Sequence, residues 1–202
     1  MSSIIALKDK KMVHVIADTQ TTTRINKKNH LEDSNLKIFK AEGINDCLIG
    51  KVGYVKEKSV LSNVDFGLKH LDDVTFNDVV RIILPKMLEA LESQNRTKNT
   101  ENETLGTTII VLKEKIYQID YTMAVSEIND YVAIGSGLEI VNGVLKSNKN
   151  KNSKERIIEA IEAVSKFNNG VSAPFIYYNT EKMKMEIIGE EKENVNDNSD
   201  KI

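Results

Sequence analysis

Ser2 is the residue near the start of the chain that could act as a nucleophile. If the initiator Met1 is removed, Ser2 carries a hydroxyl and a free α-amine on one residue. Removal is expected because serine is small. The ordinary pKa of an α-amine is about 7.7 to 8.0, so a share of it is neutral at pH 7 and can accept the hydroxyl proton. The chemistry indicated is attack by the Ser2 oxygen, with the amine as base.

Asp18 and Lys37 are candidates to support that nucleophile. Asp18 ends the apolar run VHVIA, and Lys37 lies between Leu36 and Ile38 in a predicted strand. An ammonium held by Asp18 near Ser2 would stabilise a developing alkoxide. Each residue also has an ordinary interpretation. An aspartate at a strand end favours a turn, and a strand lysine can lie along apolar surface with its ammonium in water.

Composition describes an ordinary globular protein. The chain has 202 residues, 29% of them charged and 40% hydrophobic, which predicts one domain with a substantial core. The net charge of −2 shows no excess of positive charge of the kind that binds nucleic acid. The single cysteine, Cys47, allows no intrachain disulfide and sits in an apolar run, as a small core residue would.

Several classes of protein and site are not indicated. No apolar run approaches the roughly 20 residues of a membrane span, and the start lacks the basic and apolar regions of a secretion signal. We therefore expect a cytoplasmic protein that does not contact a membrane. No Cys/His cluster and no Gly-rich phosphate loop is visible, so neither a metal nor a cofactor is expected.

The predicted elements alternate in groups. Runs of strands separated by pairs of helices are typical of a layered α+β fold. Thr75 is a predicted helix cap with Asp78 three residues later, and Pro85 should kink the helix that follows. Residues 19–35 form a predicted loop. Strands are expected at 3–7, 12–17, 36–42, 46–53, 106–113, 115–123, 130–137, 173–179 and 182–188, and helices at 54–70, from 75, at 137–146 and at 153–167.

Four segments together carry a family resemblance. The opening SSIIALKDKKMVHVIADTQTT resembles the start of mature proteasome β subunits and of their bacterial relative HslV, and the spacing from Ser2 to Asp18 matches theirs. NLKIFKAEGINDCLIGKVG is similar to the segment with the family's catalytic lysine. LGTTIIVL and YVAIGSG resemble two later strands of the same fold. The likeness covers residues 2–188 in element order.

The resemblance implies a fold and a mechanism. The fold is the αββα sandwich of N-terminal nucleophile hydrolases, with two sheets between two helix layers. The reaction is hydrolysis of peptide bonds. By position, Ser2 would attack the scissile carbonyl, Lys37 held by Asp18 would stabilise the alkoxide, the Gly53 N–H would bind the oxyanion, and Ser136 would support the nucleophile.

Other positions depart from the family or bear on substrate choice. The nucleophile is serine rather than threonine, and Asn169 stands where the family has an aspartate three residues before a serine, here Ser172. Both changes predict weaker activity, and Asn169 and Ser172 also fit a polar turn. Lys51 maps to the floor of the first specificity pocket, where an unpaired ammonium would prefer an acidic P1 residue. Thr22 is a further expected substrate contact.

The resemblance also implies partners. Family members work as rings that take peptides or unfolded proteins, in HslV from an ATPase unfoldase, so a homo-oligomeric ring is expected. Residues 189–202 are expected to form a disordered polar tail. Three alternatives remain open: an inactive structural or peptide-binding subunit of the same fold, an N-terminal nucleophile amidase acting on a small amide, and an unrelated non-enzymatic binding domain.

Overall fold

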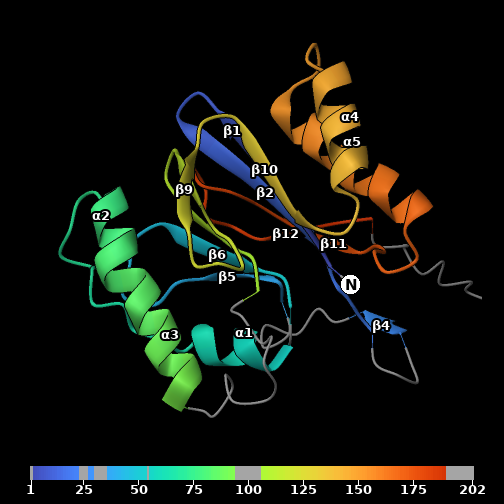
Figure 1. Cartoon of the computed structure of the whole chain (residues 1–202). Coiled ribbons are helices and arrows are strands. Elements are labelled where there is room, and N and C mark those ends of the chain that lie inside the picture. The colour runs from blue at the N-terminus through green and yellow to red at the C-terminus, as the bar shows by residue number, and fades with distance from the viewer. Residues whose placement is uncertain (1, 23–26, 30–35, 54, 94–105, 190–202) are drawn as a thin grey trace, which may run out of the picture.

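Two five-stranded antiparallel sheets face each other in the computed structural model of the chain (Figure 1). The structure describes residues 2–22, 27–29, 36–53, 55–93 and 106–189. Helices cover the outer face of each sheet. The predicted sandwich of four layers, αββα, is confirmed.

The first sheet holds both ends of the described chain. Its order is β10-β1-β2-β11-β12. The predicted hairpin at the N-terminus is confirmed, with Ile4 opposite Ala17, and so is the closing hairpin of the last two strands. The strands are β1 (Ser3–Asp9), β2 (Met12–Asp18), β10 (Tyr131–Gly135), β11 (Phe175–Asn179) and β12 (Glu186–Ile188).

The second sheet runs in chain order, β5-β6-β7-β8-β9. Its strands are β5 (Ile38–Lys40), β6 (Cys47–Lys51), β7 (Thr108–Leu112), β8 (Lys115–Ile119) and β9 (Val125–Ile128). The strand β9 was not predicted. The segment predicted as a loop, 19–35, contains a short hairpin of β3 (Gln20–Thr22) and β4 (Lys27–Asn29).

The helices match the predictions with two corrections. They are α1 (Val55–Leu61), α2 (Phe76–Asp78), the π-helical turn η2 (Val79–Ile83), α3 (Leu84–Ser93), α4 (Leu138–Ser147) and α5 (Ser153–Phe167). The helix predicted over 54–70 ends at Leu61, before a segment with Asn63, Asp65 and Gly67, which favour turns. The expected distortion at Pro85 takes the form of the wide turn η2 directly before it.

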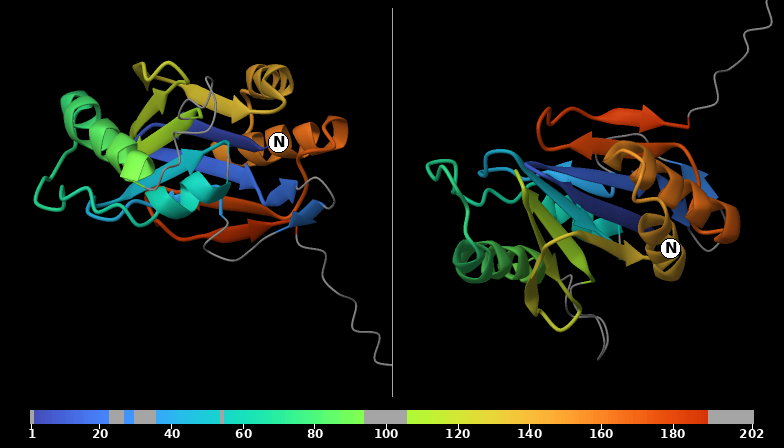
Figure 2. Two further views of the ribbon diagram at one scale, coloured as in Figure 1. Left: turned by 60° about the horizontal axis from the view of Figure 1, so that its bottom comes forward. Right: turned by 90° about the horizontal axis from the view of Figure 1, so that it is seen from above.

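Strand alternation divides the apolar side chains among three cores. On β1, Ile4 and Ala6 point between the sheets, whereas Ile5 and Leu7 pack against α4 and α5. On β6, Leu48 points between the sheets and joins the first pair. Figure 2 shows the helices on the two outer sides of this sandwich. The pattern fixes the register of both sheets, because a slip by one residue would expose these side chains.

The helix on the other outer face begins with the cap that the sequence predicted. The Thr75 hydroxyl accepts from the Asp78 N–H, and the Asp78 carboxylate accepts from the Thr75 N–H. On β6, Ile49 faces this helix layer and packs in one core with Leu61 and Met87. The predicted tail, 189–202, lies outside the described residues except for Gly189.

Candidate active site

The carboxylate of Asp18 ties the end of β2 to the start of β1. Its Oδ1 accepts a hydrogen bond of 2.8 Å from the Ser3 N–H, and its Oδ2 accepts one of 3.2 Å from the Gln20 N–H. Only 1% of Asp18 is exposed. Burial raises the pKa of Asp18, against the opposing effect of the ammonium of Lys37 and of these two N–H donors. The carboxylate is thus fixed beside the residue that follows the predicted nucleophile.

Lys37 and Asp18 form a buried ion pair, as the sequence predicted. The Lys37 Nζ lies 2.5 Å from Asp18 Oδ2 and also donates to the Gln20 carbonyl oxygen over 2.8 Å. Burial lowers the pKa of Lys37, and Asp18 opposes that shift. These two contacts use two of the three protons of the Lys37 ammonium.

The backbone of Ser2 is held by the segment after β10. The Ser136 N–H donates to the Ser2 carbonyl oxygen over 2.7 Å. Gly135 has a φ of +93°, and a Cβ there would lie 2.0 Å from the same oxygen and 3.1 Å from Val52 Cγ1. Glycine is therefore required, and Ser2, Ser136 and the turn at 52–53 meet at one place.

Gly53 lies in an exposed turn above a buried ion pair. Its φ is +125°, which favours glycine. The Lys51 Nζ lies 3.0 Å from Glu57 Oε2 and donates to the Gly106 carbonyl oxygen over 3.1 Å. Lys51 is fully buried, and burial lowers its pKa against the effect of Glu57. The sequence predicted an unpaired ammonium at Lys51. That prediction is wrong, because Glu57 pairs with Lys51 in the structure.

Lys58, the next residue of α1, is a third buried lysine near these groups. Only 3% of it is exposed. The pKa of Lys58 is lowered to about 8, mainly by burial and then by the charges of Lys37 and Lys51, whereas Asp18 acts in the opposite direction. No carboxylate pairs with Lys58 among the ion pairs of the described residues. The buried ionisable residues of the site are therefore three lysines, Lys37, Lys51 and Lys58, and two acids, Asp18 and Glu57.

The loop before β11 reaches the same end of the sheet. Gln20 Nε2 donates to the Asn169 carbonyl oxygen over 3.3 Å, and Thr19 Oγ1 donates to that of Pro174 over 2.8 Å. These contacts bring the loop that contains Asn169 and Ser172 next to the residues that follow Asp18. Thr22 lies on β3, opposite Lys27.

Three residues of the site were not predicted. Gln20 positions Lys37 through its carbonyl, a backbone contact that no side-chain pattern signals. Glu57 and Lys58 lie in the charged run KEK, which is typical of a solvent-exposed helix face, yet both are at most 5% exposed. The one feature of the sequence that could have pointed to Glu57 and Lys58 as site residues is their closeness along the chain to Lys51 and Gly53.

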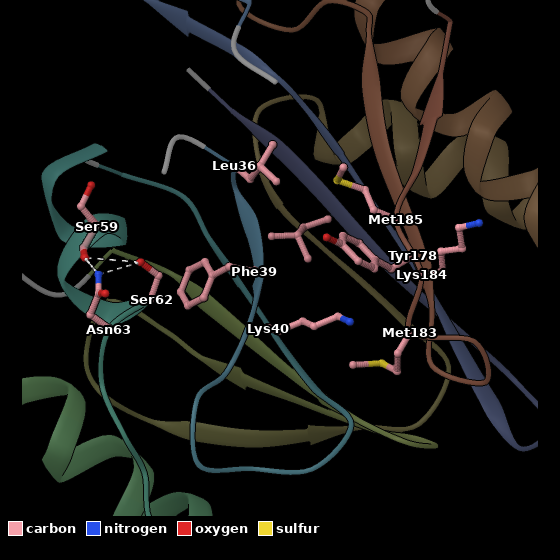
Figure 3. Close-up of a pocket in the computed structure, with 11 residues that line it drawn as sticks. Leu36, Phe39, Lys40, Ser59, Ser62, Asn63, Tyr178, Met183, Lys184 and Met185 are labelled. Carbon is pink, nitrogen blue, oxygen red and sulfur yellow. Dashed lines mark hydrogen bonds between the residues drawn. The ribbon is translucent and has the colours of Figure 1, made fainter. Parts of the chain in front are cut away.

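A cavity of about 670 Å³ lies beside the site and contains none of the candidate catalytic residues. It opens between α1, β5 and the β11–β12 hairpin (Figure 3). On the α1 side, Asn63 Nδ2 donates to the Ser59 carbonyl oxygen over 2.8 Å. Leu36 and Ile38 line the cavity, but Lys37 between them does not. The other lining residues are Phe39, Lys40, Ser62, Tyr178, Met183, Lys184 and Met185.

Other groups in the described residues offer little chemistry. Burial raises the pKa of the Cys47 thiol, which makes it a poor nucleophile. Within 2–22, 27–29, 36–53, 55–93 and 106–189 no group of three His, Cys, Asp or Glu residues could hold a metal ion. None of the helices described is long and apolar enough to cross a membrane.

Comparison with known proteins gives structural matches only. No protein-family model matches the sequence, and no curated protein matches it. Thiobacillus denitrificans BPH in complex with epoxomicin matches with a TM-score of 0.70 at 17% identity, over 88% of this chain and 97% of that one. Eukaryotic HslV from Trypanosoma brucei matches with a TM-score of 0.60 at 14% identity, over 88% and 98% of the two chains.

Anbu, an ancestral β-subunit, from Yersinia bercovieri also matches, with a TM-score of 0.68 at 10% identity over 94% of this chain and 88% of that one. Identities this low establish the fold alone. They agree with the two sheets, the helix layers and the resemblance found in the sequence. The chain therefore has the fold of the proteasome β-like N-terminal nucleophile hydrolases.

Proposed function

We propose that this chain is a peptidase subunit whose nucleophile is the hydroxyl of Ser2, exposed by removal of Met1. One observation carries the proposal: the Asp18 carboxylate binds both the Ser3 N–H and the Lys37 ammonium. A buried lysine with its counter-ion fixed next to residue 2 is what an N-terminal serine needs to form an alkoxide at low cost.

The proposed reaction has two halves. The Ser2 amine takes the hydroxyl proton, directly or through a water, and Oγ attacks the scissile carbonyl carbon. The Gly53 N–H binds the resulting oxyanion, and the Lys37 charge stabilises the attacking oxygen. The C–N bond then breaks, and the leaving amine takes the proton from the Ser2 amine. Water hydrolyses the remaining ester and restores the hydroxyl.

Ser136, Ser172 and Asn169 are proposed to orient Ser2 rather than to react. The bond from the Ser136 N–H to the Ser2 carbonyl oxygen supports this role directly. For Asn169 and Ser172 the support is the contact of Gln20 with the Asn169 carbonyl, which brings their loop to the site. An asparagine can donate and accept hydrogen bonds but adds no charge to the centre.

We still predict a preference for an acidic P1 residue, but the Glu57 partner of Lys51 now has to be taken into account. Because Lys51 already pairs with Glu57, a substrate carboxylate would have to join that pair or replace Glu57 in it. Thr22, in the strand that follows Asp18, is proposed as a backbone or side-chain contact of the substrate. Comparison of Glu-, Leu- and Arg-P1 fluorogenic peptides tests the preference, which faster cleavage after Leu or Arg would exclude.

We also propose that the chain works as a homo-oligomer. Phe167, at the end of α5, is 79% exposed, and Leu138, at the start of α4, is 40% exposed. A Cβ at Gly137, next to Leu138, would contact Val164 of α5, so these exposed residues lie at neighbouring helix ends. Subunit contacts would remove this apolar surface from water. The Anbu complex from Pseudomonas aeruginosa, whose chain has the same fold, forms a helical assembly.

The nucleophile is tested by intact mass before and after exposure to a peptide epoxyketone. This reagent forms its ring adduct only with a free α-amine and a hydroxyl on one residue. We expect loss of Met1 and one adduct per chain at Ser2, and no adduct in Ser2→Ala. Loss of Met1 without an adduct, together with no cleavage of the peptide panel, would instead favour a structural subunit. Retained Met1 would exclude the mechanism.

A further inference from the structure

The segment before β7 is held against the end of β6 by the side chain of Lys51. The Gly106 carbonyl oxygen accepts from Lys51 Nζ over 3.1 Å and from Thr108 Oγ1 over 3.1 Å, so two donors hold it. The Lys51 ammonium lies 3.0 Å from Glu57 Oε2 on α1. Lys51 and Thr108 are fully buried, and Glu57 is 5% exposed. Gly106 is therefore held by a buried polar network that runs through Lys51 to α1.

Gly106 faces the carbonyl group of Val52, which belongs to the same peptide unit as the Gly53 N–H. A Cβ at Gly106 would lie 2.6 Å from the Val52 carbonyl oxygen and 3.6 Å from the Val52 carbonyl carbon. Because the oxygen is nearer than the carbon by most of the length of a C=O bond, this carbonyl points at Gly106. The Val52 N–H is also bound, to the Thr107 carbonyl oxygen over 3.2 Å. A side chain at position 106 would therefore push the Val52 carbonyl aside.

The same peptide unit lies next to the proposed nucleophile. A Cβ at Gly135 would lie 2.0 Å from the Ser2 carbonyl oxygen and 3.1 Å from Val52 Cγ1, so these two atoms are near neighbours. The proposed reaction needs the Gly53 N–H to bind an oxygen of the substrate beside Ser2. A hydrogen bond weakens steeply when its donor is misaligned, so the direction of this N–H matters for the reaction.

The direction of the Gly53 N–H follows from that of the Val52 carbonyl. In a trans peptide the C=O and N–H groups point to opposite sides, so the Gly53 N–H points away from Gly106. We infer that Gly106, held in place by Lys51 and Glu57, orients the N–H that binds the oxyanion. These three residues are positioning residues, and the inference rests on the proposed function.

The test changes the two ends of this network separately, in full-length protein. Gly106→Ala places a methyl group against the Val52 carbonyl. Gly106 does not have the positive φ that strains alanine, so this contact is the main obstacle. Glu57→Gln keeps the shape of the side chain and removes the counter-charge of Lys51, which would no longer be held beside Gly106. Glu57→Gln adds no bulk, so it decides the outcome if Gly106→Ala does not fold.

Each variant has a matched control away from the site. Gly143→Ala, in α4, controls for Gly106→Ala, because a Cβ at Gly143 meets nothing within 4 Å. Glu159→Gln controls for Glu57→Gln, because Glu159 pairs with Lys151 in an ion pair that is partly exposed.

Crystal structures and steady-state kinetics are the two readouts. In Gly106→Ala the Val52 carbonyl oxygen has to move from 2.6 Å to an ordinary contact of at least 3.4 Å from the added methyl, and the Gly53 N–H moves with it. The kinetics give kcat and KM for a fluorogenic peptide with Leu at P1, which brings no charge to Lys51.

We expect kcat to fall by about tenfold or more in Gly106→Ala and Glu57→Gln, with KM within about twofold of the wild type. The reason is that the oxyanion forms only on the way through the transition state, so its donor contributes little to the binding of the substrate. Both controls should keep the wild-type kcat and KM. A role in packing alone would not separate kcat from KM in this way.

The inference and the proposed function fail separately. If the Val52 carbonyl moves in the variants but the wild type cleaves no peptide, the orienting role of Gly106 stands and the proposed function falls. If the wild type is active and the carbonyl keeps its position in both variants, or moves without a change in kcat, the inference is overturned and the proposed function stands.

Discussion

The Asp18 carboxylate and the Ser3 backbone N–H are joined across the N-terminal hairpin by a buried hydrogen bond of 2.8 Å. Ser3 directly follows the proposed nucleophile, so the contact transmits the position of the Asp18–Lys37 pair to Ser2. The same carboxylate is the counter-ion of Lys37. One side chain thus fixes both the geometry and the charge of the site.

Asp18→Asn should destabilise the protein by about 3–5 kcal/mol, because Lys37 would be left buried without a counter-charge. The amide oxygen can still accept from Ser3, so the loss reports mainly on the charge. Urea denaturation at pH 7 measures it. Adding Lys37→Met should recover part of the loss, and Asp9→Asn, at the other end of the hairpin, should cost less than about 1 kcal/mol. A small effect of Asp18→Asn would show that the pair does not hold this end of β2.

Much of the fold and part of the site follow from local patterns. The N-terminal hairpin, α4 and α5 were predicted because their apolar periodicity matches the buried faces. The strand β9 was missed because VSEI is short and none of its residues is buried. Asp18 and Lys37 could be paired because each interrupts an apolar run. The burial of Glu57 and Lys58 depends on how α1 packs over the Gly53 turn, which local sequence does not encode.

Ser2→Ala should abolish peptide hydrolysis and the epoxyketone adduct while leaving the fold intact, because only one hydroxyl is removed. Ser2→Thr should keep activity or raise it several-fold, since the added methyl restricts χ1 and holds the oxygen in fewer orientations. Both residues are small, so removal of Met1 is expected in each variant and is checked by mass. Turnover of a fluorogenic peptide measures the effect. Full activity in Ser2→Ala would exclude Ser2 as nucleophile.

Lys58→Met should stabilise the protein at pH 7. The pKa of Lys58 is about 8 in the folded chain and 10.5 in the unfolded one. Between these values the unfolded chain binds more protons, so the free energy of unfolding of the wild type rises with pH. Below pH 8 the full cost is present, about 3 kcal/mol for a shift of this size. Replacement by methionine removes this loss of stability and also the contribution of Lys58 to the pH dependence of the free energy of unfolding.

Urea denaturation at pH 7 and pH 10 tests this account of Lys58. The wild type should gain stability relative to Lys58→Met as the pH rises, and Lys40→Met should behave as the wild type does. A Lys58→Met variant that is less stable than the wild type at both pH values would mean that Lys58 contributes packing rather than an unfavourable charge. A buried charge that lowers the stability of the folded chain is a candidate for a functional role.

Gly135→Ala should disturb Ser2 far more than an equivalent change elsewhere. A Cβ at Gly135 would lie 2.0 Å from the Ser2 carbonyl oxygen, and a φ of +93° is strained for alanine, so β1 must shift at its first residues. Gly143, in α4, is the matched control because a Cβ there meets nothing within 4 Å.

We expect Gly135→Ala to cost about 1–3 kcal/mol of stability and more than tenfold in kcat/KM, because the nucleophile is displaced from Lys37. Gly143→Ala should leave kcat/KM unchanged and add about 1 kcal/mol, since alanine favours a helix over glycine. Denaturation and peptide turnover measure the two effects on the same samples. Equal activity in both variants would show that the bond from Ser136 to the Ser2 carbonyl does not position the nucleophile.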